Sequence, residues 1–208
     1  MSSGRRAARL PVAFFKRDAA SVARDLLGRL LVTEFRGRRA AGRIVEVEAY
    51  LGAEDPASHA YRYRRHAQNQ ALYGSAGDWY VYLSYGVHWC ANLVVGPPGE
   101  GAAVLLRALE PVEGLGLMRR RRGIEPPRLL CAGPGRLTQA LGITRAIDGS
   151  PMRAAPAWLE VGRPPEDSDI LETPRIGITR AVEWPLRFIE RASPWLSGPG
   201  KRNGDRSS

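Results

Sequence analysis

The chain has 208 residues, a formal net charge of +10 and 44% apolar residues, a composition that excludes a wholly disordered chain. The length predicts one large domain or two small ones. This positive net charge favours a polyanionic partner, either nucleic acid or an anionic membrane. Genomic base composition alone would also produce an excess of arginine.

Along the chain, Asp18 is expected to cap a helix over residues 19–27. Strands are expected at residues 30–35 and 41–50. The polar stretch 51–77 has no clear period, so we expect a long functional loop there. The later elements are expected to be strands at 79–85, 87–95 and 103–109, helices at 113–121 and 135–141, and strands at 157–161, 175–178 and 186–189. This order predicts a single α+β domain with a mixed or antiparallel sheet.

Cysteine usage and hydropathy indicate a cytoplasmic protein. Cys90 and Cys131 form no CxxC pattern, so one disulfide is possible but a reducing compartment is expected. No apolar run approaches the roughly 18 residues of a membrane span. Residues 1–10 are basic but lack a following apolar segment, so we expect a disordered arm rather than a signal peptide. The tail 198–208 is also expected to be disordered, which leaves a domain over residues 11–197.

Charge and aromatic residues are segregated along the chain. Residues 1–66 and 119–208 are rich in arginine, whereas residues 67–118 contain one basic residue, Arg107. This charge-poor middle contains six aromatic residues: Tyr73, Trp79, Tyr80, Tyr82, Tyr85 and Trp89. Such a centre between basic flanks is what a stacking site on nucleic acid needs, although composition alone favours an ordinary aromatic β core.

Strand alternation over residues 43–50 predicts that two carboxylates and a ring share one face, Glu46, Glu48 and Tyr50, opposite the apolar Val45, Val47 and Ala49. A carboxylate backed by apolar core can act as a general base. The face can equally be solvated, with its glutamates paired to surface arginines. A third, weaker alternative is a metal site that also uses Glu54 and Asp55.

The segment 79–92 predicts a β-hairpin whose tip carries Tyr85 immediately before Gly86. A large ring exposed at such a tip either inserts into a base stack or folds back onto its own core. Arg107 lies alone in an apolar strand, so it is expected to be functional or paired with Glu46 or Glu48.

These segments together resemble the mammalian type of alkyladenine (3-methyladenine) DNA glycosylase. The resemblance covers about residues 12–197 and rests on RIVEVEAYLG at 43–52, Glu54-Asp55 with His59, YVYLSYGVHWCAN at 80–92, VLLRALEP at 104–111, LCAGP at 130–134, PRIG at 174–177 and SPW at 193–195. It implies a curved sheet surrounded by helices, with a protruding hairpin that enters the DNA minor groove. Gln68, the stretch YGSAG at 73–77 and Val87 depart from the common pattern. At Gln68, either a phosphate contact is missing or Arg64 or Arg65 replaces it.

The resemblance also implies catalytic roles. Glu48 matches the general base that activates water, and Arg107 matches the arginine that helps to hold that water. Glu46 inherits no catalytic role and is expected to be structural.

For the substrate, the resemblance implies that Tyr50, His59 and Tyr82 form the walls against a flipped purine. Tyr85 matches the residue that fills the gap in the duplex. Asn92 matches the residue that discriminates against the exocyclic amino group of guanine.

These roles predict a monomeric, monofunctional DNA glycosylase of base excision repair, which needs no metal or cofactor. It would hydrolyse alkylated or deaminated purines (the 3-methyladenine, hypoxanthine and ethenoadenine class) from double-stranded DNA, and would be nucleoid-associated if bacterial. Lyase chemistry usually needs an amine, and the only lysines, Lys16 and Lys201, lie outside the motifs. The alternatives are a non-catalytic DNA-damage-binding protein and a metal-dependent nuclease that uses Glu46 and Glu48.

Overall fold

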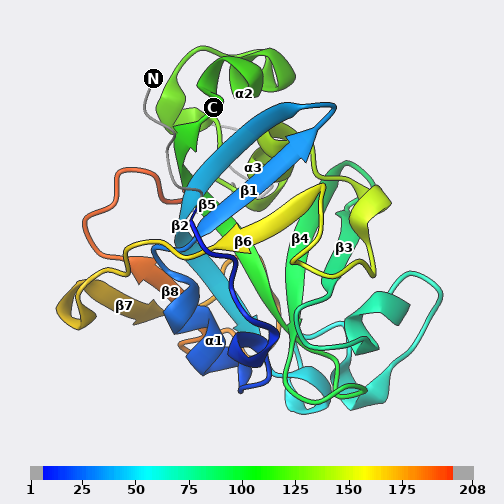
Figure 1. The fold of residues 1–208 in the computed structure, drawn as a ribbon. Coiled ribbons are helices and arrows are strands. Elements are labelled where there is room, and N and C mark those ends of the chain that lie inside the picture. Colours follow the sequence, from blue (N-terminus) through cyan, green and yellow to red (C-terminus); the bar gives the residue numbers. More distant parts are fainter. Residues whose placement is uncertain (1–6, 199–208) are drawn as a thin grey trace, which may run out of the picture.

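A computed structural model describes residues 7–198 (Figure 1). Its strands form one curled sheet in the order β3-β4-β5-β2-β1-β6, and β8 pairs with β2 and carries β7. All pairings between these strands are antiparallel. The strands are β1 Leu30–Phe35, β2 Arg38–Tyr50, β3 Trp79–Ser84, β4 His88–Val95, β5 Ala102–Glu113, β6 Ala157–Glu160, β7 Ile170–Thr173 and β8 Arg187–Glu190. The single α+β domain expected from the sequence is confirmed.

Three α-helices accompany the sheet within the described residues: α1 Ala19–Leu26, α2 Leu115–Arg122 and α3 Pro134–Leu141. The predicted cap of α1 is confirmed, because the Asp18 carboxylate accepts a hydrogen bond from the Ser21 amide at 2.9 Å. Helix α1 packs on β2 and β5, and α3 packs on β4 and β5. The main apolar core therefore lies between these helices and the sheet.

The start predicted for the second helix is wrong. Glu113 belongs to β5, which is longer than the sequence suggested, and the helix begins at Leu115. Gly114 separates the two with a φ of +76°, and a Cβ there would meet the Arg39 carbonyl oxygen at 2.6 Å. Only glycine allows so sharp and so close a change of direction.

Strand β2 contains a bulge that shifts its faces. Ile44 lies opposite Leu109 and Val47 lies opposite Leu106, and the register shifts between them on both sides of Glu46. As a result Ile44, rather than Val45, joins Val47 in the main core. The bulge leaves the predicted carboxylate face intact from Glu46 onward.

The predicted hairpin is present as β3 and β4. Its tip residues Tyr85 and Gly86 both have positive φ, +50° and +69°. A bulky residue in this conformation is uncommon and mildly strained. The Tyr85 side chain is 91% exposed, so it does not fold back onto its own core.

The strand predicted at residues 175–178 is wrong. The late strand is β7, which ends at Thr173 immediately before Pro174, a residue with no amide hydrogen for a ladder. The chain after β7 instead lies against β2, where the Ile176 amide donates to Glu48. This connection to β8 therefore covers the carboxylate face.

The long stretch 51–77 holds three short 3₁₀ helices, Gly52–Glu54, Tyr61–Tyr63 and Gln70–Tyr73. The other 3₁₀ helices are Val12–Phe15, Pro127–Leu129, Arg145–Ile147 and Asp167–Asp169.

The two predicted terminal arms lie largely outside the described residues, which exclude 1–6 and 199–208. Within the first arm, the Leu10 amide donates to the Leu159 carbonyl at 3.0 Å, and the Ala8 carbonyl accepts from the Val161 amide at 2.7 Å. Residues 8–10 thus lie along β6. No helix in residues 7–198 is long and apolar enough to cross a membrane.

Candidate active site

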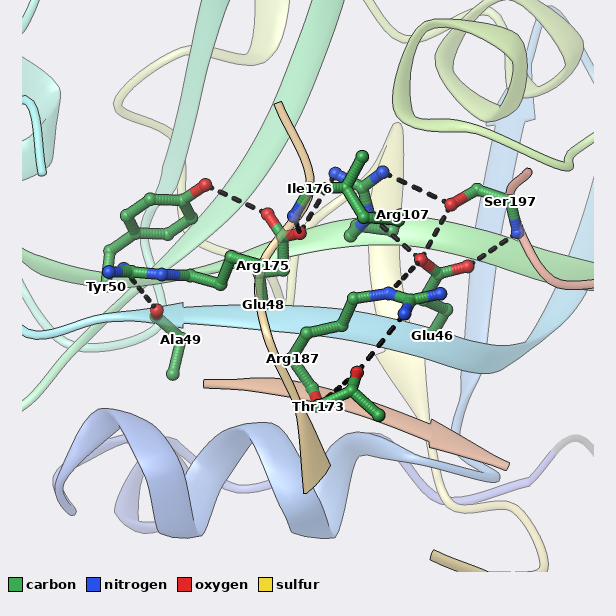
Figure 2. Close-up of polar contacts among 10 residues, drawn as sticks. All are labelled: Glu46, Glu48, Ala49, Tyr50, Arg107, Thr173, Arg175, Ile176, Arg187 and Ser197. Carbon is green, nitrogen blue, oxygen red and sulfur yellow. Dashed lines mark hydrogen bonds and ion pairs between the residues drawn. The ribbon is translucent and has the colours of Figure 1, made fainter. Parts of the chain in front are cut away.

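Strand β2 presents Glu46, Glu48 and Tyr50 on the face turned away from the main core (Figure 2). The side chains of both glutamates are completely buried. The segment after β7 and the chain around Ser197 lie over them (Figure 2). This burial excludes the alternative of a solvated strand face.

Glu48 is held by three donors from separate parts of the chain. Its Oε2 accepts from the Tyr50 hydroxyl at 2.9 Å, and its Oε1 accepts from the Ile176 amide at 2.8 Å. The Arg107 Nη1 lies 3.2 Å from Oε1. Since a carboxylate offers about four acceptor sites, Oε2 retains an acceptor site beyond its bond to Tyr50.

Tyr50 remains a hydrogen-bond donor at physiological pH. Burial, followed by the Glu48 charge, raises the pKa of its phenol well above the ordinary value. The Arg175 guanidinium stacks on its ring, 4.7 Å from the centroid. Arg175 is itself fixed by two bonds to Asp55 and one to the Ala49 carbonyl.

Arg175 and its partner Asp55 were missed as site residues by sequence reasoning, because Arg175 was expected in a regular strand and Asp55 as a possible metal ligand. The signal available in the sequence was a pair of opposite charges, Asp55 and Arg175, in two of the motifs that carry the resemblance. The two residues are 120 positions apart, so no local pattern indicated that they meet.

Glu46 is the centre of a second buried cluster. Its Oε1 accepts from Arg107 Nε at 2.9 Å, Arg187 Nε at 2.7 Å and the Ser197 hydroxyl at 2.6 Å. Its Oε2 accepts from the Ser197 amide, also at 2.6 Å. Arg107 therefore pairs with both glutamates, where the sequence had predicted Glu46 or Glu48.

The cluster keeps Glu46 ionised. Burial by itself would raise the pKa of Glu46, but the Arg107 charge, the Ser197 hydrogen bonds and the Arg187 charge outweigh it and lower that pKa below 4.5. The resulting stabilisation is fully present above pH 4.5 and is lost as the pH falls through the lowered value.

We therefore expect Glu46→Gln to reduce the free energy of unfolding at pH 7 by about 3 kcal/mol, since an uncompensated charge is left buried. The deficit should shrink below pH 4.5, because the unfolded wild-type chain then binds the proton that the folded carboxylate resists. Urea unfolding at a series of pH values from 7 to 3 measures the free energy of unfolding of the wild type and of the variant. A deficit that stays constant over this range would show that the Glu46 charge is not what stabilises the fold.

A wall of rings continues the site onto β3. Tyr80 and Tyr82 stack with centroids 5.5 Å apart and planes at 27°. His59 lies edge-on to Tyr82 at 4.5 Å, and its Nδ1 is 2.8 Å from the Tyr80 hydroxyl. His59 is partly exposed, but desolvation by its neighbours, with the charges of His66 and Arg64 adding to it, lowers its pKa, so the imidazole is neutral at pH 7.

Asn92 and Tyr85 occupy different parts of the hairpin. Asn92 lies on β4 opposite Tyr80, is buried, and donates to the Tyr80 carbonyl at 3.0 Å. Tyr85 lies at the exposed tip, three residues beyond Tyr82. The structure thus joins Glu48, Tyr50 and Arg107 by direct contacts and groups His59 with Tyr82, whereas Tyr85 stands apart.

The acidic residues considered for metal binding have other partners. The Asp55 oxygens accept from Arg175 and from backbone amides, and Glu46 is enclosed by two arginines and Ser197. Across residues 7–198, no group of three or more His, Cys, Asp or Glu side chains is arranged to hold a metal ion. Cys90 and Cys131 are both free thiols in the interior.

The structure therefore combines a curled antiparallel sheet with a buried, arginine-paired carboxylate that lies beside stacked rings. The chain belongs to the methylpurine-DNA glycosylase family, whose model matches residues 13–194. A protein of Methanoculleus marisnigri assigned as a 3-methyladenine DNA glycosylase is 50% identical over 191 residues, which cover 90% of this chain and 98% of the relative. Proteins of the same assignment from Agrobacterium fabrum and Rhodopseudomonas palustris are each 49% identical, over 90% and 91% of this chain and 92% and 88% of their own lengths.

Proposed function

We propose that the chain is a monofunctional DNA glycosylase that hydrolyses the N-glycosidic bond of damaged purines flipped out of duplex DNA. The observation that carries the proposal is the Glu48 carboxylate, fixed by Arg107, Tyr50 and the Ile176 amide beside the aromatic wall. The family membership and the assigned names of the relatives support the same reaction.

In this proposal Glu48 takes a proton from water as the water oxygen bonds to the anomeric carbon. The bond from that carbon to the purine nitrogen breaks, and its electron pair leaves with the base. The negative charge of Glu48 also stabilises the oxocarbenium-like transition state, as carboxylates do in other glycoside cleavage. Arg107 holds Glu48 in place through the contact of its Nη1 with Oε1.

The rings are proposed to bind the base. Alkylated adenine is cationic, and the faces of Tyr50 and Tyr82 opposite those covered by Arg175 and Tyr80 are proposed to attract it. The lowered pKa of His59 keeps that imidazole neutral, so it contacts the base without repelling it. Asn92 is proposed to discriminate against the amino group of guanine from its buried place beside Tyr80.

Lysine placement supports hydrolysis without lyase chemistry. Lys16 is exposed at the end of a 3₁₀ helix before α1, and Lys201 lies outside the described residues. No lysine amine therefore lies within the described site to form a Schiff base with the sugar.

Base release from duplexes that each carry one lesion, assayed in EDTA, tests the function. We expect free base and abasic DNA from at least one of 3-methyladenine, hypoxanthine and ethenoadenine, with no borohydride-trapped adduct. Binding to these duplexes without any release would instead establish the non-catalytic damage binder. Release that stops in EDTA would indicate metal-dependent chemistry.

The exposed ring of Tyr85 is proposed to fill the gap left by the flipped base. Tyr85→Ser should then lower excision from duplex DNA by about tenfold or more, because unstacking costs a few kcal/mol that the ring offsets. Excision from single strands is the internal control and should change little. Equal losses on both substrates would contradict the role.

The basic flanks are proposed to hold phosphates. Arg62, Arg64 and Arg65 are exposed on the loop that follows His59, and the Arg65 guanidinium rests 3.8 Å from the Tyr73 ring centroid. The loop is anchored by the buried Asn69, whose side chain donates to the Arg64 carbonyl at 2.9 Å. We propose that Arg64 or Arg65 replaces the phosphate contact that Gln68 does not supply.

A further inference from the structure

Ser197, near the end of the described chain, lies on the buried ion pairs of the site (Figure 2). Its hydroxyl donates to Glu46 Oε1 at 2.6 Å and accepts from Arg107 Nη2 at 3.2 Å. Its backbone amide donates to Glu46 Oε2 at 2.6 Å. A single small residue thus bonds to both members of one buried salt bridge.

These contacts account for every nitrogen of Arg107. Nε points to Glu46, Nη2 points to the Ser197 hydroxyl, and Nη1 points to Glu48. Because the guanidinium is planar and rigid, fixing Nε and Nη2 fixes the direction of Nη1. The contacts of Nε and Nη2 with Glu46 and Ser197 therefore set the direction in which Nη1 points toward Glu48.

We propose that Ser197 is a positioning residue for the hydrolysis: with Glu46, it holds Arg107 in the orientation that aims Nη1 at Glu48. This inference rests on the proposed function. Ser197 bonds to Arg107 and Glu46, so its effect reaches Glu48 through the orientation of Arg107. The segment that carries it also covers the Arg107–Glu46 pair, and a pair shielded from water interacts more strongly.

The hydroxyl is the group that the inference requires. Without it, Arg107 Nη2 and Glu46 Oε1 each lose a buried partner, and the guanidinium keeps two contacts, from Nε to Glu46 and from Nη1 to Glu48, in place of three. A less well-aimed guanidinium stabilises the negative charge of Glu48 less in a site where preorganised charges dominate catalysis.

The test compares Ser197→Ala with Ser193→Ala in single-turnover base release, using the lesion that the wild type excises fastest. Ser193 lies in the same segment, and its hydroxyl only accepts from the Trp195 amide, so it is the matched control. We expect Ser197→Ala to slow release at saturating enzyme by about tenfold, the lower end of what the loss of hydrogen bonds to charged groups costs. DNA binding should stay within twofold of wild type.

Two further measurements separate positioning from mere stability. The acid limb of the rate–pH profile should move to higher pH in Ser197→Ala but not in Ser193→Ala, and Ser197→Thr, which keeps the hydroxyl, should restore both rate and profile. An unchanged rate, or a loss matched by the unfolded fraction with an unmoved acid limb, would overturn the inference while leaving the proposed function standing. Absence of release by the wild type would instead remove the proposed function and this inference together.

Discussion

Glu48→Gln is expected to lower single-turnover base release by about a thousandfold, while binding of the same DNA changes by less than about twofold. General-base assistance contributes roughly 10²–10⁴ in rate, and the amide can neither accept the proton from water nor supply a negative charge. Glutamine keeps the shape of the side chain and an oxygen that can accept from the Tyr50 hydroxyl. Because Arg107 loses one of its two carboxylate partners in this variant, base release is compared under conditions in which both proteins are fully folded.

Glu54→Gln is the matched control, because Glu54 is an exposed glutamate six residues further along the chain. Its release rate should equal that of the wild type. If Glu48→Gln also released base at the wild-type rate, the assignment of Glu48 as general base would be wrong.

Arg107→Met is expected to cause the largest loss of stability, a decrease of about 3–5 kcal/mol in the free energy of unfolding at pH 7. Burial opposes the charge of Arg107, but Glu48 and Glu46 raise its pKa above the ordinary value, so the ion pairs hold it charged. Removing it leaves two fully buried carboxylates with one fewer cation between them. Arg187 remains on Glu46 but does not replace the contact to Glu48.

Arg119→Met supplies the comparison, since Arg119 pairs with the exposed Glu125 at 3.4 Å. Such surface pairs contribute about 0–1 kcal/mol. Urea unfolding of the two variants should therefore differ by several kcal/mol. Similar losses would mean that the buried pairs contribute no more than surface ones.

Local sequence patterns were sufficient for the elements that build the site. Strand period placed Glu46, Glu48 and Tyr50 together, and the Asp18 cap and the hairpin around Gly86 were found where the chain signals them. These features depend on neighbours only a few residues away.

The sequence did not predict which segments of the chain lie over the carboxylates of Glu46 and Glu48. Arg175 meets Asp55 across 120 residues, and Ser197 meets Glu46 across 151. Such contacts follow from how the chain closes over β2, which no local period encodes. The bulge near Val45 was hidden for the same reason, since it is defined only by the partner strand β5.

We propose above all that this site hydrolyses damaged purines from DNA with Glu48 as the general base. The most direct test of this proposal is chromatographic detection of free base from methylated duplex DNA in EDTA, with wild type and Glu48→Gln at equal fractions of bound DNA. We expect free methylated purine and abasic DNA from the wild type, and release about a thousandfold slower from the variant. Equal rates from the two proteins, or no release from wild type that is fully bound to the DNA, would contradict it.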